Sequence, residues 1–133
     1  MPSVIIASGP VIIENHKVLL NKDAKDDFWK FCGGRVEEHE TNVKDTARRE
    51  AKEEMGLDIE ILNEEPCFYY TEKNINEVKT SIILVHFLAK RLNEIVPGKD
   101  TLDWRWIDIS DLAKENLAPN VKPTLKHFGF LTE

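Results

Sequence analysis

The sequence predicts a single α+β domain in which short strands surround one long helix. Most of the chain consists of segments rich in β-branched and aliphatic residues that are separated by polar turns. One segment, residues 42–55, instead has the apolar spacing of an amphipathic helix. A chain of 133 residues has the ordinary size of one domain, so we expect residues 1–133 to fold as a single unit.

The N-terminal part predicts a hairpin followed by a loop. Two aliphatic segments flank Glu14-Asn15-His16, which is a typical two-strand turn. A polar stretch follows, and a short aromatic segment then leads into Gly33 and Gly34. The predicted elements are strand 4–14, strand 17–21, loop 22–27 and strand 28–31.

The segment 42–55 predicts the one long helix. Asn42 is a good N-cap, and Asp45 three residues later is close to the capping-box arrangement. Gly56 is suited to end the helix, because glycine adopts the left-handed conformation of a C-cap. The apolar stripe that would pack on the sheet is formed by Val43, Ala47, Ala51 and Met55.

The C-terminal half predicts further strands and two short helices. The apolar run at residues 80–91 is typical of a central strand. Ser110 and Asn120 are the expected N-caps of the two helices. The predicted strands are 57–62, 66–71, 80–91 and 104–109, the helices are 111–116 and 121–128, and the connections expected to rim a pocket are 72–77 and 93–102.

Three glutamates on the long helix stand at the spacing of a metal site. Glu50, Glu53 and Glu54 occupy positions i, i+3 and i+4, so their carboxylates share one edge of the helix. Like charges repel there, but a hard divalent cation such as Mg²⁺ prefers these oxygen ligands. The alternative is an ordinary solvated helix face whose charge is offset by neighbouring basic residues.

The residues before the helix make the metal hypothesis more specific. Gly33 and Gly34 permit close approach of a ligand to the backbone, and Glu40 adds another carboxylate. The run from Gly34 to Leu57 resembles the signature of the Nudix hydrolase family, G-x5-E-x7-R-E-U-x-E-E-x-G-U, where U is aliphatic. The half from Arg49 to Leu57 matches every specified position if alanine is accepted as the first U.

The spacer of the signature is one residue too long. Eight residues separate Glu40 from Arg49, where the family pattern has seven. An extra residue inside the helix would rotate the glutamates by about 100° relative to the sheet. Asn42 stands seven residues before Arg49, as the cap does in the family, so we predict that Thr41 is the extra residue and lies in the loop. The contact between Glu40 and Arg49, which is a supporting contact in the family, stays open.

The resemblance implies a fold, a reaction and a cofactor. The Nudix fold is an α/β/α sandwich with a mixed sheet, and the family hydrolyses phosphoanhydride bonds with metal-activated water. It implies that Glu50, Glu53 and Glu54 bind Mg²⁺, or Mn²⁺ as a substitute, with a backbone carbonyl of Gly33 or Gly34. Arg49 would orient this cluster. Glu53 is the first candidate for the general base, and the candidates outside the helix are Asp100 and Asp103.

Several residues are candidates for binding the substrate. Arg35 and Lys30 flank the diglycine and can contact phosphates, although either can equally be a solvated surface residue. Five aromatic residues can stack on a nucleobase, and we expect one or two of them to do so. Because side chains alternate along a strand, only one of Tyr69 and Tyr70 can face the ligand. The aromatic candidates are Trp29, Tyr69, Tyr70, Trp104 and Trp106.

Composition limits the class of partner. A net charge of −6 argues against general nucleic-acid binding, and it requires a cation between the protein and a polyphosphate. Cys32 and Cys67 fit free thiols in a reducing cytoplasm. The apolar run 82–89 is too short to cross a bilayer, and the N-terminus has no basic leader. An edge strand near the N-terminus would permit a homodimer.

Two functions therefore compete. The first is a magnesium-dependent hydrolase of a nucleoside diphosphate linked to another group, such as a nucleoside triphosphate, a dinucleoside polyphosphate or a nucleotide sugar. The second is a nucleotide-binding or regulatory module of the same shape, in which the extra residue has impaired catalysis. Retention of all three helix glutamates favours the enzyme.

Overall fold

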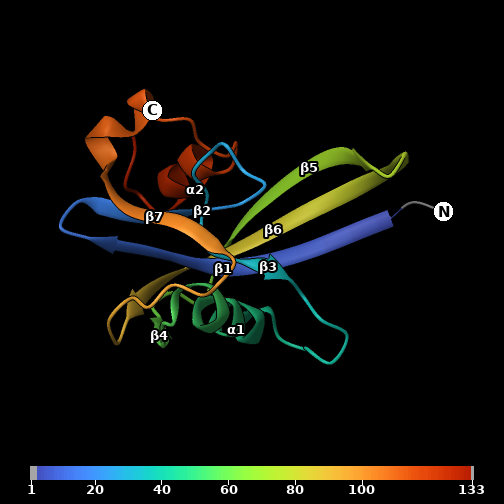
Figure 1. Ribbon diagram of the computed structural model, residues 1–133, viewed down its shortest axis with the longest axis horizontal. Helices are drawn as coiled ribbons and strands as arrows, with labels where there is room; N and C mark the ends of the chain where they lie inside the picture. The colour runs from blue at the N-terminus through green and yellow to red at the C-terminus, as the bar shows by residue number, and fades with distance from the viewer. Residues whose placement is uncertain (1–2, 133) are drawn as a thin grey trace.

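The computed structural model, which describes residues 3–132, has a mixed sheet with helices on both faces (Figure 1). The strand order is β4-β6-β1-β2-β7, with β3 paired to β1 and β5 paired to β6. This arrangement confirms the predicted α+β class and the α/β/α sandwich. The strands are β1 (Ser3–Glu14), β2 (Lys17–Asp23), β3 (Gly34–Arg35), β4 (Ile59–Ile61), β5 (Cys67–Ile75), β6 (Val78–Arg91) and β7 (Thr101–Asp108).

The long strands β1 and β6 form the centre of the sheet. They run parallel, from the pair Ser3 and Thr80 to the pair Ile12 and Ala89. The other strand pairs are antiparallel, which makes the sheet mixed. The central place of β6 confirms the expectation from its apolar run.

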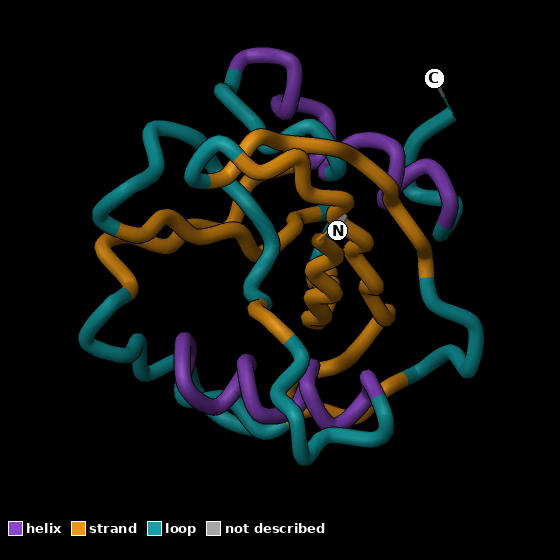
Figure 2. Tube along the Cα trace, turned by 90° about the vertical axis from the view of Figure 1, so that its right-hand side faces the viewer, coloured by secondary structure: helices purple, strands orange, loops and turns teal. Residues whose placement is uncertain are grey.

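Helices cover both faces of the sheet. Helix α1 (Val43–Met55) lies on one face, whereas the 3₁₀ helix η1 (Ile109–Lys114) and helix α2 (Val121–His127) lie on the other (Figure 2). The stripe residues Ala47, Ala51 and Met55 are buried against the sheet. Each face therefore has its own apolar core, and α1 is held with one defined side against β1 and β6.

The ends of α1 agree with the sequence except at Asp45. The Asn42 side chain accepts a hydrogen bond from the Lys44 N–H at 2.9 Å, and Gly56 ends the helix with φ of 66°. The predicted capping box is wrong, because the Asp45 carboxylate pairs with Arg48 at 2.9 Å. The helix nevertheless begins and ends where its caps predicted.

Several other boundaries differ from the predictions. The expected strand 28–31 is reduced to two isolated bridges, between Asn21 and Lys30 and between Trp29 and Leu117. Most of the expected loop 72–77 is strand, because β5 continues to Ile75 in antiparallel pairing with β6. Ser110 is not the N-cap of η1, since the Asp108 carboxylate accepts from the Ser110 N–H.

Two further observations concern the class of protein. Cys32 and Cys67 are both buried free thiols, as expected. Within residues 3–132, none of the helices has the length and hydropathy needed to cross a membrane.

Candidate active site

The acidic edge of α1 is continuous and faces the diglycine segment. The helix is unbroken from Val43 to Met55, so Glu50, Glu53 and Glu54 keep the spacing that the sequence predicts. Glu50 is buried, with 8% of its surface exposed, whereas the Glu53 side chain is 57% exposed. The edge therefore runs from the protein interior to its surface.

The diglycine segment is in contact with this edge. A Cβ atom on Gly34 would overlap the Glu50 carboxylate, lying 2.5 Å from its Cδ atom. The Gly33 N–H donates to Oε1 of Glu54 at 3.3 Å, and the Asn21 Nδ2 donates to the same oxygen at 3.2 Å. Glycine at position 34 leaves the Glu50 carboxylate in the space that a side chain would occupy.

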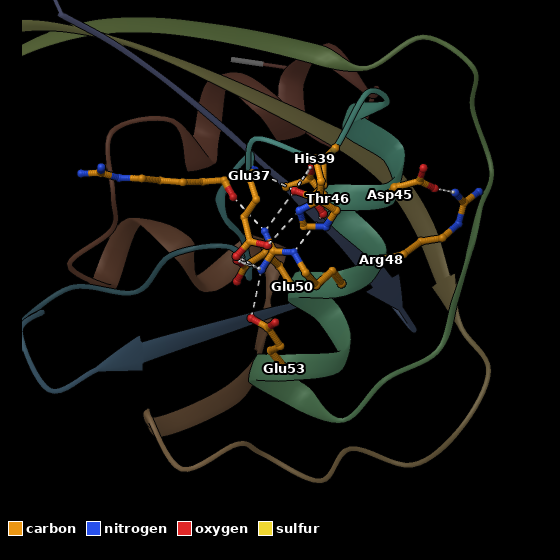
Figure 3. A network of polar contacts seen from close by, with 10 residues as sticks. Glu37, His39, Asp45, Thr46, Arg48, Glu50 and Glu53 are labelled. Atoms are coloured by element: carbon orange, nitrogen blue, oxygen red, sulfur yellow. Dashed lines mark hydrogen bonds and ion pairs between the residues drawn. The ribbon is translucent and has the colours of Figure 1, made fainter.

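The guanidinium of Arg49 connects the loop carboxylate to the helix carboxylates (Figure 3). It donates to both oxygens of Glu40, from Nε at 2.9 Å and from Nη2 at 3.2 Å. It also donates from Nη1 to Oε2 of Glu50 at 2.9 Å and to Oε1 of Glu53 at 3.0 Å. A further bond from Nη2 to the carbonyl of Arg35 at 2.8 Å places the helix against β3.

The extra residue of the spacer lies in the loop, as predicted. Thr41 is exposed and precedes the N-cap Asn42, so it does not enter the helix. Glu40 still reaches Arg49, and its Oε1 also accepts from the hydroxyl of Thr46 at 2.9 Å. The contact between Glu40 and Arg49 is thus made despite the longer spacer.

The charges of this network shift two pKa values in opposite directions. Hydrogen bonds from Arg49 are the main cause that lowers the pKa of Glu40 to about 2. Burial, followed by the neighbouring Glu54 carboxyl, raises the pKa of Glu50 to about 7, although Arg49 opposes this rise. The Glu50 carboxylate therefore has too little positive charge around it in this conformation.

This shortage of positive charge around Glu50 is the observation that fits a divalent cation. Across residues 3–132, no three His, Cys, Asp or Glu side chains are arranged to hold a metal ion in the present conformation. The Glu53 carboxylate accepts a hydrogen bond from the same Arg49 nitrogen, Nη1, that donates to Glu50, so the guanidinium occupies both carboxylates. The donor set consists of hard carboxylate oxygens and suits Mg²⁺ once Glu53 leaves its ion pair.

The two loop acids that were candidates for the base have different surroundings. Asp100 lines a surface hollow together with Lys99, Thr101 and the three helix glutamates. Asp103 is outside this hollow, and its carboxylate accepts from the N–H of Trp104 at 2.8 Å. The structure brings Asp100 to the acidic edge and leaves Asp103 away from it.

A cavity of about 280 Å³ opens on the other side of the diglycine segment. Gly33 and Gly34 line it, so they touch both the cavity and the acidic edge. Tyr69 lines the cavity, whereas Tyr70 is exposed and bonds to Glu72, in agreement with strand alternation. The cavity is also lined by Asp26, Phe28, Lys30, Phe31, His86 and Asn120.

Two predicted substrate contacts, Lys30 and Trp29, are placed less favourably. Lys30 lines the cavity but pairs with Asp23 and Asp26, each at 2.9 Å. Trp29 is only 3% exposed, and both Lys22 and Arg105 lie 4.6 Å from its ring centroid. It does not line the cavity, so the geometry does not favour base stacking by Trp29.

The remaining predicted contacts lie outside the cavity. Arg35 is exposed beside the Arg49 network and has no side-chain contact with the cavity. Trp104 and Trp106 are partly buried and pack against the core beneath α1. Tyr69 is thus the predicted aromatic residue that the structure places in the cavity.

Sequence reasoning missed residues whose roles depend on distant partners. Asn21 bonds to Glu54 across 33 residues, and Thr46 bonds to Glu40. His86 and Asn120 line the cavity from β6 and from the start of α2. The one signal available was the presence of a polar residue, Asn21 or His86, within an aliphatic strand.

Comparison with known proteins shows the family to which this chain belongs. The model of the NUDIX domain matches residues 5–128. The chain is 32% identical over 115 residues to a protein named 8-oxo-dGTP diphosphatase from Buchnera aphidicola subsp. Schizaphis graminum, a match covering 83% of this chain and 82% of that protein. It is 26% identical to the m7GpppN-mRNA hydrolase of Saccharomyces cerevisiae, covering 90% of this chain but 12% of that protein.

Solved structures show the same fold. A NUDIX hydrolase from Nitrosomonas europaea superposes with a TM-score of 0.78 at 16% identity, covering 95% of this chain and 88% of that one. The MutT NUDIX hydrolase from Burkholderia pseudomallei gives a TM-score of 0.73 at 20% identity, covering 93% and 97%. The chain therefore belongs to the NUDIX family and is a Nudix-type pyrophosphohydrolase, an enzyme that acts on acid anhydrides.

Proposed function

We propose that this chain is a magnesium-dependent hydrolase of a nucleoside diphosphate linked to another group, and that a nucleoside triphosphate is the first substrate to test. The observation that carries the proposal is the position of Gly33 and Gly34 between the carboxylates of Glu50 and Glu54 and the cavity. A ligand seated in the cavity would extend its phosphates across the two glycines toward the acidic edge.

The proposed metal ligands are Glu50, Glu53, Glu54 and a backbone carbonyl of Gly33 or Gly34. Mg²⁺ bound there, or Mn²⁺ in its place, would offset charge on the phosphoryl oxygens and lower the pKa of the attacking water. Arg49 keeps the Glu50 and Glu53 carboxylates beside each other through its bonds to both, and Glu53 would exchange its bond to Arg49 for the cation when Mg²⁺ binds. Because Arg49 is itself fixed by Glu40, the loop sets the position of the whole edge.

The reaction also needs a base for the attacking water. The water oxygen bonds to one phosphorus, the bridging P–O bond breaks, and a water proton passes to a carboxylate. Glu53, which is also a proposed ligand, and Asp100 are the candidates, because both line the hollow at the acidic edge. Asp103 is the weaker candidate, since its carboxylate bonds to its own backbone neighbour.

The substrate class rests on the cavity and on the relatives. The cavity walls include Phe28, Phe31 and Tyr69, which suit a planar base, and Asn120 offers an amide for hydrogen bonds. The relative named 8-oxo-dGTP diphosphatase covers most of both chains and favours a nucleoside triphosphate. The relative named mRNA hydrolase is matched over 12% of its length and gives weaker support for a capped RNA.

The remaining parts of the proposal concern partners and location. A net charge of −6 favours small nucleotides over general nucleic-acid binding. Within residues 3–132, the N-terminal part of β1 pairs with β6 alone, which leaves an edge where a second copy could pair to form a homodimer. Free buried cysteines favour a reducing cytoplasm.

The deciding experiment measures product release from a panel of nucleoside triphosphates, dinucleoside polyphosphates, nucleotide sugars and capped RNA, with magnesium and with EDTA. We expect magnesium-dependent turnover of at least one substrate, with ¹⁸O from water in one phosphate product. Glu53→Gln and Glu54→Gln should each reduce kcat by about 100-fold or more.

A matched control is Glu38→Gln, which removes an exposed carboxylate from the loop before the helix. This variant should retain the wild-type rate. Tight nucleotide binding without metal and without turnover of any panel member would instead support the nucleotide-binding module.

A further inference from the structure

Asn21 is a buried residue of β2 that bonds to the acidic edge and to which the proposed reaction assigns no role. It is only 3% exposed and follows the buried aliphatic residues 18–20. Its backbone exchanges two hydrogen bonds with Lys30, at 2.8 and 3.0 Å, and it stands opposite Trp104 of β7 in the strand register. The backbone of Asn21 is therefore held on both sides.

The side chain of Asn21 contacts Glu54. Its Nδ2 donates to Oε1 of Glu54 at 3.2 Å, and the Gly33 N–H donates to the same oxygen at 3.3 Å. The amide presents its nitrogen here because an amide oxygen would repel the carboxylate. Two donors thus hold Oε1 of Glu54, and neither of them uses Oε2.

These two donors are neutral, which distinguishes Glu54 from the other carboxylates of the acidic edge. Arg49 donates to Glu50 and Glu53 with a charged guanidinium. The amide of Asn21 and the backbone N–H instead fix the direction of the Glu54 carboxylate without placing a full positive charge beside it. A carboxylate held in this way keeps its negative charge for a cation.

The other end of the Asn21 amide has no protein partner. Its Oδ1 is buried and makes no hydrogen bond with any residue of the described range 3–132. Buried polar atoms are almost always paired in folded proteins, and an unpaired one lowers stability. Leucine has nearly the same shape and would fill this position of an aliphatic strand without that cost. The bond to Glu54 explains why an amide stands here.

We propose that Asn21 is a positioning residue of the metal site, which fixes the Glu54 carboxylate through Oε1 and leaves Oε2 to a divalent cation. This inference rests on the proposed function for the identity of the cation ligands, but its own content is the role of Asn21. The residue acts through Glu54 and touches neither the cation nor the substrate. Removing a side chain that hydrogen-bonds a metal ligand typically costs about 10- to 100-fold in metal affinity or activity.

This role predicts that one substitution affects metal binding and stability differently. Asn21→Leu removes the donor to Glu54 together with the unpaired Oδ1, so it should weaken cation binding without lowering stability. A residue with a merely structural role would give the opposite result, which is lower stability with unchanged affinity for the cation.

The test titrates the whole protein with Mn²⁺ in the absence of nucleotide and follows the EPR signal of the free ion. Asn21→Leu should weaken Mn²⁺ binding by about tenfold or more. Its urea midpoint in EDTA should equal or exceed that of the wild type. In the nucleotide panel, kcat at low magnesium should fall by about tenfold or more, and a higher magnesium concentration should restore part of it.

Three further variants complete the test. Asn21→Val carries the same prediction with a smaller side chain that suits a strand. Asn21→Gln keeps the amide donor and should retain more Mn²⁺ affinity than Asn21→Leu. Thr80→Val is the matched control, because it also replaces a buried polar side chain on a strand, and the Thr80 hydroxyl bonds to the Val78 carbonyl instead of a carboxylate. This control should leave the Mn²⁺ affinity unchanged.

Specific results would overturn the inference. Wild-type Mn²⁺ affinity in Asn21→Leu and Asn21→Val would refute the positioning role, and so would a wild-type protein that binds no Mn²⁺. If Asn21→Leu also loses stability, the absence of any recovery in Asn21→Gln would refute it as well.

The outcome for Asn21 is separate from the outcome for the proposed hydrolase. Unchanged Mn²⁺ affinity in the variants would leave the hydrolase intact if the nucleotide panel still shows magnesium-dependent turnover. Conversely, weaker Mn²⁺ binding by a stable Asn21→Leu protein would support the role of Asn21 even if no panel member is hydrolysed.

Discussion

The carboxylate of Glu40 accepts two hydrogen bonds from the guanidinium of Arg49, although one residue more than the family spacing separates them along the chain. The same guanidinium bonds to Glu50 and Glu53. Glu40 thus acts on the acidic edge through Arg49 and does not need to touch the substrate.

Replacing Glu40 by glutamine should loosen the acidic edge. Glu40→Gln removes the charge that holds Arg49, and it replaces one of the two oxygens that accept from the guanidinium by an NH₂ donor. We expect a loss of about 2 kcal/mol in the free energy of unfolding, together with a fall of about tenfold or more in kcat. Urea unfolding and initial rates measure both effects. Glu38→Gln, in the same loop, should change neither quantity, and equal effects of the two variants would refute the role of Glu40.

Deleting Thr41 should be tolerated. The residue is exposed and lies before the helix, so its removal restores the family spacing without rotating any glutamate. We expect a rate within about threefold of the wild type, because the helix register does not change. Inserting an alanine after Ala51 should abolish activity, because it rotates Glu53 and Glu54 by about 100° relative to Glu50. A deletion as harmful as the insertion would contradict this account.

A methyl group at position 34 should displace Glu50 while leaving the fold intact. The Cβ atom of Gly34→Ala would overlap a carboxylate at the end of a flexible side chain, which can swing away. We expect kcat to fall by about 100-fold with a nearly unchanged melting temperature. Gly9→Ala is the contrasting variant, because its Cβ atom would meet the backbone carbonyl of Cys32. That variant should lose about 1–3 kcal/mol of stability.

The raised pKa of Glu50 predicts a pH-dependent cost in the metal-free protein. Between pH 4.5 and about 7 the folded protein holds a proton on this carboxyl that the unfolded chain has lost, so stability falls as the pH rises through this window. Glu50→Gln should recover about 2 kcal/mol above pH 7, after allowance for partial solvent screening. Urea unfolding in EDTA at pH 5 and pH 8 measures the difference, which should be small at pH 5.

His86 predicts the opposite slope in nearly the same pH range. Burial lowers its pKa to about 4, so the unfolded chain binds a proton between pH 6.5 and 4 that the folded protein does not bind. Stability should decrease by about 3 kcal/mol as the pH falls through this window. Because Glu50 acts in the other direction, the test is the difference between wild type and His86→Phe at each pH. A difference that does not vary with pH would contradict the lowered pKa.

Features set by local spacing were predictable from the sequence. The shared edge of Glu50, Glu53 and Glu54 follows from helical periodicity, and the ends of α1 follow from Asn42 and Gly56. The position of Thr41 could be predicted for the same reason, since the cap fixes where the helix begins. The roles of the glutamates as metal ligands stay predictions.

Features that depend on distant partners were not predictable. Asp45 was expected to complete a capping box, but Arg48 competes for its carboxylate. Trp29 was expected at the ligand, yet Arg105, 76 residues away along the chain, covers its ring. The local sequence does not predict such a contact. The contact forms because the sheet pairs β2 with β7, which carries Arg105.

The loop before β7 is bonded to the end of α1. The N–H groups of Val96 and Gly98 donate to the carbonyls of Met55 and Glu54, and the Thr101 hydroxyl donates to Glu54 as well, each at 2.8 Å. This loop therefore serves as the C-terminal support of the helix as well as the carrier of Asp100. Loop grafts from relatives should be made together with the last helical turn, because an exchanged loop of another length would leave those carbonyls without donors.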